Sequence, residues 1–250
     1  MDGVHLHALG QGISEAAVCT DCHTAHSVQR LTDQRTGRSL PEARNYITEM
    51  CQQCHSNIYD EFVHSVHGRS LLIDGNLDSP TCVDCHGVHE MEGPSTSPFR
   101  LFSPQTCATC HADEYMMARN NISTAVFDTY VADFHGTTVT LFQRTAPDQR
   151  FNSPVCADCH GVHNIMAVDE PDSPVMKENL LTVCQDCHPN ATANFPAAWM
   201  SHYQPTFENA PLVATVNLAY GILIPVVIGG MVVFVAFDVR RRSFGRRKDR

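Results

Sequence analysis

The chain has 250 residues, with 17 Lys and Arg against 27 Asp and Glu, so its formal net charge at pH 7 is -10. An acidic chain repels the phosphate backbone, and nucleic acid is therefore not an expected partner. The length allows one or two ordinary domains.

All twelve cysteines fall in six copies of Cys-x-x-Cys-His. Two thiols on one turn can reach the two vinyl groups of a single porphyrin, and the following histidine then lies beneath the iron. A zinc protein or a disulfide framework would not need a histidine after each pair. The sequence therefore predicts six c-type haems as cofactors. Covalent attachment is expected at Cys19, Cys22, Cys51, Cys54, Cys82, Cys85, Cys107, Cys110, Cys156, Cys159, Cys184 and Cys187. The proximal iron ligands are expected to be His23, His55, His86, His111, His160 and His188.

The six motifs alternate between two kinds along the chain. The first, third and fifth, here called odd motifs, read Cys-x-Asp-Cys-His-x-x-His, whereas the second, fourth and sixth, the even motifs, lack the trailing histidine. A His-Gly step stands upstream of two odd motifs, at His67-Gly68 and His135-Gly136. This repetition predicts three tandem two-haem units, at about 1–63, 64–130 and 131–202.

The nine histidines outside the motifs are candidates for the six distal ligand positions. Binding by imidazole on both faces of each iron suits electron transfer. Residues three apart on a helix lie about 5–6 Å apart on one face, so a trailing histidine cannot close on its own iron and should serve another haem. The distal ligands are expected to be the trailing His26, His89 and His163, together with His67, His135 and His202, which follow even motifs. Less certain are His5, His7 and His64; one of the first two occupies the place of His67 but has no upstream haem to serve, so it either ligates by another route or is a spare.

The alternation of Cys-x-x-Cys-His-Gly-x-His with plain Cys-x-x-Cys-His resembles the doubled-motif multihaem cytochromes c, which include periplasmic pentahaem and decahaem electron carriers of anaerobic respiration. The resemblance covers about residues 4–202. It implies a fold of mainly coil with short α-helices packed around stacked c-type haems. Two departures are Thr24, where the other odd motifs have Gly87 and Gly161, and the lack of the Cys-x-x-Cys-Lys found in pentahaem nitrite reductases.

Residues 212–237 form a 26-residue stretch without a charge, followed by a basic tail at 238–250. Such a stretch is long enough for a transmembrane α-helix, and the positive-inside rule predicts a cytoplasmic tail. Residues 1–211 would then form an extracytoplasmic, periplasmic hexahaem domain on a single-pass anchor in the cytoplasmic membrane. The family resemblance agrees, because it implies haem attachment outside the cytoplasm. The first residues contain no export signal, so we expect the natural precursor to begin further upstream.

Charge and small residues indicate two kinds of partner. Residues 1–211 hold ten Lys and Arg against 25 Asp and Glu, a net charge of -15, which favours a basic or neutral soluble partner unless the acidic face is merely solvated. Along the expected membrane helix, Asn217, Gly221, Pro225 and Gly229 recur every four residues. This stripe predicts packing on an integral subunit, the alternative being a kinked solitary anchor.

These features favour an electron-transfer protein without catalytic residues of its own. It would relay electrons between an integral membrane partner, quinone-binding or a b-type cytochrome, and a soluble cytochrome or terminal reductase. One alternative is a catalytic multihaem reductase of a small oxyanion or sulfur compound, which requires an open iron position. Another is a quinol dehydrogenase subunit, similar to the small tetrahaem anchors of nitrate and nitrite respiration, although those carry their helix at the N-terminus.

Overall fold

The computed structural model describes residues 3–94, 96–198, 202, 205–208 and 210–245. These residues form helices and loops and contain no strand, the only β-type pairing being an isolated bridge between Thr32 and Ser39. The expectation of short helices joined by loops is confirmed. The chain divides into two compact units, Met1–His202, here called the head, and Tyr203–Arg250.

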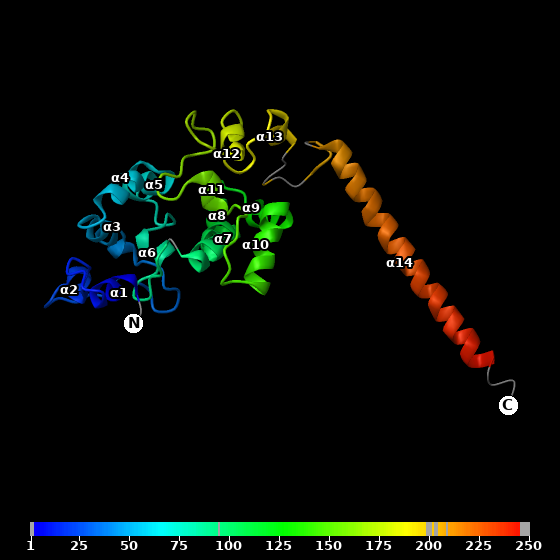
Figure 1. Ribbon diagram of the computed structural model, residues 1–250, viewed down its shortest axis with the longest axis horizontal. Coiled ribbons are helices and arrows are strands. Elements are labelled where there is room, and N and C mark those ends of the chain that lie inside the picture. Colours follow the sequence, from blue (N-terminus) through cyan, green and yellow to red (C-terminus); the bar gives the residue numbers. More distant parts are fainter. Residues whose placement is uncertain (1–2, 95, 199–201, 203–204, 209, 246–250) are drawn as a thin grey trace. The chain divides into compact units, whose positions relative to one another are not determined.

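The head is built from thirteen short α-helices and one 3-10 helix among the described residues, and α7 is the longest of them (Figure 1). The elements of its first part are α1 (Val4–Gly10), α2 (Cys19–His23), η1 (Pro41–Ala43), α3 (Arg44–Gln52), α4 (Ser56–His64), α5 (Val66–Leu72) and α6 (Cys82–His86). Those of its second part are α7 (Ser97–His111), α8 (Glu114–Arg119), α9 (Ala125–Ala132), α10 (Phe134–Thr145), α11 (Cys156–His160), α12 (Leu180–Cys187) and α13 (Asn194–Ala198).

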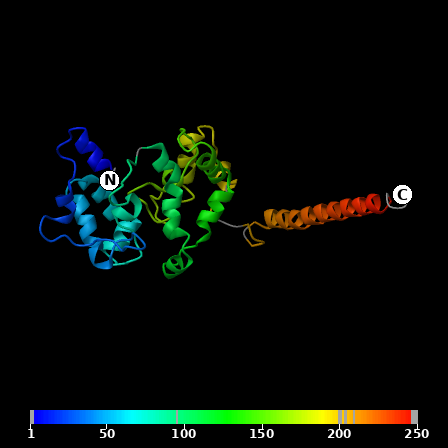
Figure 2. The same ribbon diagram turned by 90° about the horizontal axis from the view of Figure 1, so that it is seen from below.

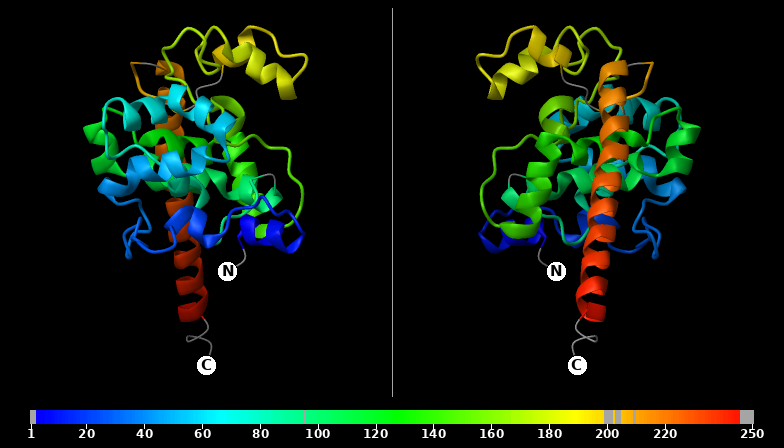
Figure 3. Two further views of the ribbon diagram at one scale, coloured as in Figure 1. Left: turned by 90° about the vertical axis from the view of Figure 1, so that its left-hand side faces the viewer. Right: turned by 90° about the vertical axis from the view of Figure 1, so that its right-hand side faces the viewer.

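The first and the last helices of the head lie far apart. In Figures 1, 2 and 3 the blue helices α1 and α2 lie at one end of the head and the yellow helices α12 and α13 at the other. Two of the contacts between successive predicted units are alike: α3 packs on α6, and α7 packs on α11. In both, a helix that ends in an even motif contacts the short helix of the next odd motif, so the repeat seen in the sequence is also a repeat of packing.

Hydrophobic packing in the head is divided between two small clusters. Leu101, Tyr130, Val139, Phe151 and Val155 form the larger cluster, around α7, α9 and α10. The smaller one joins α3 to α6; its buried members are Ala43, Ile47 and Val83. Both clusters lie at the contacts between successive units, where they hold an even motif close to the odd motif that follows it.

The second unit contains one long helix, α14 (Pro211–Gly245). Its most apolar 18-residue window has a mean hydropathy of 2.5, and 211–241 is the one helical stretch of the described residues long and apolar enough to cross a membrane. At 1.5 Å per residue it measures about 46 Å, which exceeds the roughly 30 Å hydrocarbon layer. Figure 3 shows it as one continuous helix. A candidate membrane-spanning helix at the expected 212–237 is therefore confirmed.

Candidate functional site

The short helices α2, α6 and α11 each consist of the five motif residues of an odd motif. In each, the motif aspartate occupies the third helical position, and its Oδ2 accepts a hydrogen bond from the backbone N–H of the residue before the helix, as in a capping box. The pairs are Asp21 with Val18 at 2.8 Å, Asp84 with Thr81 at 2.7 Å and Asp158 with Val155 at 2.7 Å. This bond explains why the odd motifs read Cys-x-Asp-Cys-His, a regularity that sequence reasoning noted without giving a cause.

Each of these helices ends at a residue with positive φ. The angle is 59° at Thr24, 73° at Gly87 and 81° at Gly161, with ψ close to extended in all three. This region of backbone space is almost restricted to glycine, so the β-branched Thr24 is strained where the glycines are not. The same turn therefore follows all three odd motifs and leads to the trailing histidine in each.

The His-Gly steps lie in the first turn of α5 and α10. Ser65 and Asp133 cap these helices, each side-chain oxygen accepting from the glycine N–H at 3.0 Å. Gly68 packs so closely on the preceding chain that a Cβ there would overlap the Phe62 carbonyl oxygen, and Gly136 meets Tyr130 in the same way. The glycine is required by this close approach, which positions the histidine before it. The capping Ser or Asp two residues ahead was a readable signal that sequence reasoning missed.

Every motif histidine in the head faces one histidine from outside the motifs. The distances between ring centroids are 5.9 Å for His23–His89, 6.2 Å for His55–His5, 6.0 Å for His86–His163, 6.2 Å for His111–His67, 6.2 Å for His160–His202 and 6.4 Å for His188–His135. No motif histidine is used twice, and the partners come from distant parts of the sequence.

These separations match two imidazoles bound to opposite sides of one metal ion. A metal–imidazole bond is about 2.0–2.1 Å long, so two such nitrogens are about 4.1 Å apart and their ring centroids about 6.3 Å apart. A haem iron takes only two ligands from the protein because the porphyrin supplies the other four. The geometry of the six pairs is therefore compatible with haem, and so is the sequence of the motifs. Among the described residues, no group of three or more His, Cys, Asp or Glu side chains could hold a bare metal ion.

The pairs follow two rules. An odd-motif histidine faces the trailing histidine of the next odd motif, as in His23–His89 and His86–His163. An even-motif histidine faces a histidine that precedes it in its own unit, as in His111–His67. His67 and His135 thus lie opposite the even motif downstream of them, not the one upstream. No odd motif follows His160 among residues 1–250, and His202 takes the position opposite it that the trailing histidine of a next odd motif would take.

Three of the nine candidates face no motif histidine. His7 contacts the Gln11 side chain at 2.9 Å, and the His64 Nδ1 lies 2.7 Å from the Asp60 carbonyl oxygen. His26 is exposed and has no hydrogen bond or ring contact among the described residues. His5, by contrast, stands opposite His55, so the histidine from the N-terminal helix is part of the set and the trailing histidine of the first odd motif is not.

Burial favours the uncharged form of half of the paired imidazoles. Removal from water, together with the smaller effect of the neighbouring His111, lowers the pKa of His67 to about 4. Burial also lowers the pKa of five other members of the pairs: His86, His111, His160, His163 and His202. A neutral imidazole is the form that binds a metal, so these rings need not lose a proton to ligate near neutral pH.

The thiols show that the six motifs form one continuous series. The Cys51 thiol neighbours that of Cys82, and the Cys107 thiol neighbours that of Cys156; these interactions raise the pKa of Cys51 and of Cys156. These two contacts join the second motif to the third and the fourth to the fifth. The other steps are electrostatic neighbours: Cys22 with Cys51, Cys85 with Cys107 and Cys110, and Cys159 with Cys184 and Cys187. Each motif therefore neighbours the next one in the sequence.

Two ion pairs repeat across the contacts between units. Arg44 Nη2 lies 3.6 Å from Asp84 Oδ2, and Arg100 Nη2 lies 2.6 Å from Asp158 Oδ2. Each arginine precedes the first cysteine of its even motif by seven residues, and each aspartate is the capping residue of the following odd motif. The first pair is buried, with side chains 3% and 7% exposed, whereas the second is 36% and 38% exposed.

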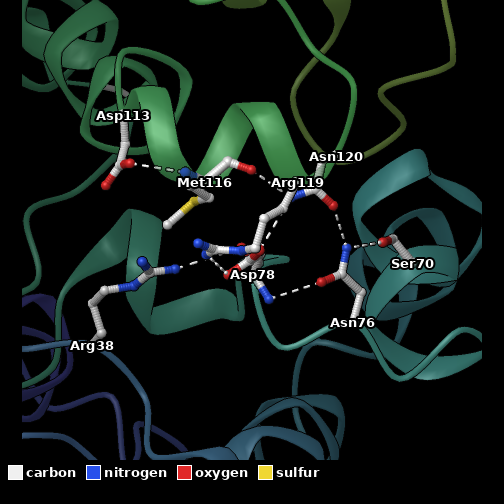
Figure 4. A network of polar contacts seen from close by, with 8 residues as sticks. All are labelled: Arg38, Ser70, Asn76, Asp78, Asp113, Met116, Arg119 and Asn120. Atoms are coloured by element: carbon white, nitrogen blue, oxygen red, sulfur yellow. Dashed lines mark hydrogen bonds and ion pairs between the residues drawn. The ribbon is translucent and has the colours of Figure 1, made fainter.

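A polar network stabilises the loop after α5 (Figure 4). Both guanidinium nitrogens Nε and Nη2 of Arg119 donate to Asp78, at 3.0 and 2.8 Å, and the Asn120 side chain donates to the same carboxylate at 3.1 Å. The Arg38 Nη2 reaches the Asp78 carbonyl oxygen at 3.5 Å, and Asn76 donates to Asn120 at 2.7 Å. The network thereby joins the loop before α3, the loop after α5 and the end of α8.

Comparison with protein-family models, curated proteins and solved structures finds no match to the chain. The functional argument therefore depends on the motifs and on the geometry of the histidine pairs.

Proposed function

We propose that the chain is a hexahaem c-type cytochrome in which each facing histidine pair binds one haem iron. One observation carries this proposal: all six motif histidines face a different outside histidine at 5.9–6.4 Å. A zinc or disulfide protein would have no need for six such pairs. The small hydrophobic clusters of the head also favour it, because large apolar cofactors would complete the interior.

The proposed activity is electron transfer rather than catalysis. Bound haem iron would supply reversible one-electron chemistry, at a potential set by burial and hydrogen bonding. The cysteines would hold each porphyrin by thioether bonds, and the paired histidines would fill both axial positions. The unbroken series of neighbouring motifs supports a relay along the head. A catalytic reductase needs an iron with an open position, and six complete pairs favour the relay over that alternative.

The membrane arrangement is also part of the proposal. The candidate membrane-spanning helix in α14 would anchor the head, and the basic tail would lie in the cytoplasm with the head on the periplasmic side. The Asn217–Gly229 stripe would pack on an integral, quinone-linked subunit. The acidic head would then pass electrons to, or receive them from, a soluble cytochrome or terminal reductase with a basic or neutral face.

The test is production of the chain with a c-type haem-attachment system, followed by acid–acetone extraction and mass measurement. Six porphyrin additions per chain are expected, with a low-spin ferric signal from all six irons in electron paramagnetic resonance. Bound zinc, or fewer than five haems, would contradict the proposal. A large high-spin signal that responds to nitrite, sulfite or hydroxylamine would favour the reductase alternative.

A further inference from the structure

His26 is the one trailing histidine without a facing partner. Its equivalents His89 and His163 follow the same helix and the same positive-φ turn, and each faces the histidine of the odd motif before its own. By the same rule, His26 would serve an odd-motif haem that precedes the first motif. The helix and turn that precede His26 are the same as in the other odd motifs, in spite of the strain at Thr24. His26 is therefore positioned like the two trailing histidines that face a motif histidine.

Asp21 gives a second, independent observation at the same place. The two equivalent aspartates, Asp84 and Asp158, each pair with an arginine of the unit before them. Asp21 keeps the capping bond to Val18 but forms no ion pair with any described Lys or Arg. The first odd motif therefore presents both halves of the contact between units, the ligand and the carboxylate, without the unit that would receive them.

We propose that this face of the head docks a further two-haem unit carried outside residues 1–250, with His26 as the distal ligand of that unit's odd-motif haem. This inference rests on the proposed function. The docking unit is expected to place an arginine seven residues ahead of an even motif, where it would pair with Asp21. A second copy of this chain does not meet the requirement, because each of its six motif histidines already faces another histidine.

The opposite end of the series is closed. The position that a next trailing histidine would take opposite His160 is filled by His202. Extension of the haem series is therefore expected only at the His26 face, which makes this face the route by which electrons enter or leave the end of the relay farthest from His202.

The experiment replaces His26 by Ala in the cells that make the protein and compares their membranes with those of wild type by electron paramagnetic resonance. Loss of the ligand should convert one ferric haem per chain from low to high spin, while the total haem content stays the same. His7→Ala is the matched control, because His7 is also exposed and faces no motif histidine, and it should change nothing. An unchanged low-spin signal in the His26→Ala membranes would overturn the proposal.

Haem counting on the purified chain separates the possible outcomes. Fewer than five haems would refute the proposed function itself, whereas six low-spin haems with no effect of His26→Ala would refute only this inference. If His26→Ala has the expected effect, the haem count shows where the extra unit is. More than six haems in the mature chain would mean that the unit belongs to the same polypeptide, and six would mean that it belongs to a separate cytochrome. In the latter case Asp21→Asn, which retains a capping oxygen, should lower co-purification of that cytochrome severalfold, and Glu49→Gln should not.

Discussion

The imidazoles of His67 and His111 face each other with centroids 6.2 Å apart, although 44 positions separate them in the sequence. His67 is held by the first turn of α5, which Ser65 caps and Gly68 allows to lie close to α4. His111 ends α7. Two unrelated local structures thus bring one ring from each to the separation of a bis-imidazole iron, and the same arrangement recurs at His135 and His188.

Replacing His67 by Ala should leave the haem on Cys107 and Cys110 with one axial ligand and convert it to the high-spin form. The other five haems should stay low-spin, because each has its own pair. Electron paramagnetic resonance of the oxidised protein gives the count. His64→Ala is the control, since His64 lies three residues away, faces no motif histidine among the described residues and has its Nδ1 next to the Asp60 carbonyl oxygen. Equal effects of the two substitutions would show that His67 is not a ligand.

Replacing His89 by Met should raise the potential of the haem on Cys19 and Cys22, because Met/His ligation raises the potential relative to two histidines and His89 faces His23. A spectroscopic redox titration would detect the shift in one of six haems. The identity of that haem is checked in a chain with Cys19 and Cys22 replaced by Ala, which lacks the first haem. There His89→Met should have no effect on the remaining titration, and a persistent shift would mean that His89 serves another iron.

The His89 case also shows what sequence reasoning could and could not reach. The three-residue spacing excludes ligation of its own haem, and that argument needs only helix geometry. Which other haem it serves depends on the packing of α3 on α6 and of α7 on α11, and nothing local in the sequence specifies those contacts. For the same reason the sequence placed His67 and His135 with the upstream even motifs, and it favoured His26 over His5 as a distal ligand, whereas His5 is the one that faces a motif histidine.

The helical content and the long apolar C-terminal helix were predictable because they depend on composition, periodicity and length. The capping residues Ser65 and Asp133 were readable as well, from a Ser or Asp at the start of a short helix. The close approach of Gly68 to Phe62 was not, since it is a contact between α5 and the helix before it. Thr24 opposes local preference, and the sequence analysis noted it only as a departure from Gly87 and Gly161, although it adopts the same positive-φ turn.

Replacing Gly68 by Ala should destabilise the head by about 1–3 kcal/mol, the usual range for overpacking, because the new methyl group would overlap the Phe62 carbonyl oxygen. Gly136→Ala should behave alike through Tyr130. Thermal unfolding followed by circular dichroism measures both. Gly10→Ala is the matched control: Gly10 ends α1 and has open space around it, so the substitution should be neutral or slightly stabilising. A loss of stability as large at Gly10 as at Gly68 would refute the steric explanation.

Replacing Arg44 by Met should cost more stability than replacing Arg100 by Met, although both arginines occupy the same place in the repeat. Arg44 and Asp84 are almost fully buried, so removal of the guanidinium leaves a buried carboxylate without its cation, at a cost of about 3 kcal/mol or more. Arg100 and Asp158 are each more than one-third exposed, and water would screen the remaining charge, so the loss should be about 1 kcal/mol or less.

Unfolding by urea in the haem-loaded protein measures the stability of both variants. At high salt the difference in stability between wild type and the Arg100 variant should shrink, because only an exposed pair is screened. Equal losses would mean that the two contacts between units are held by packing of α3 and α7 rather than by their ion pairs.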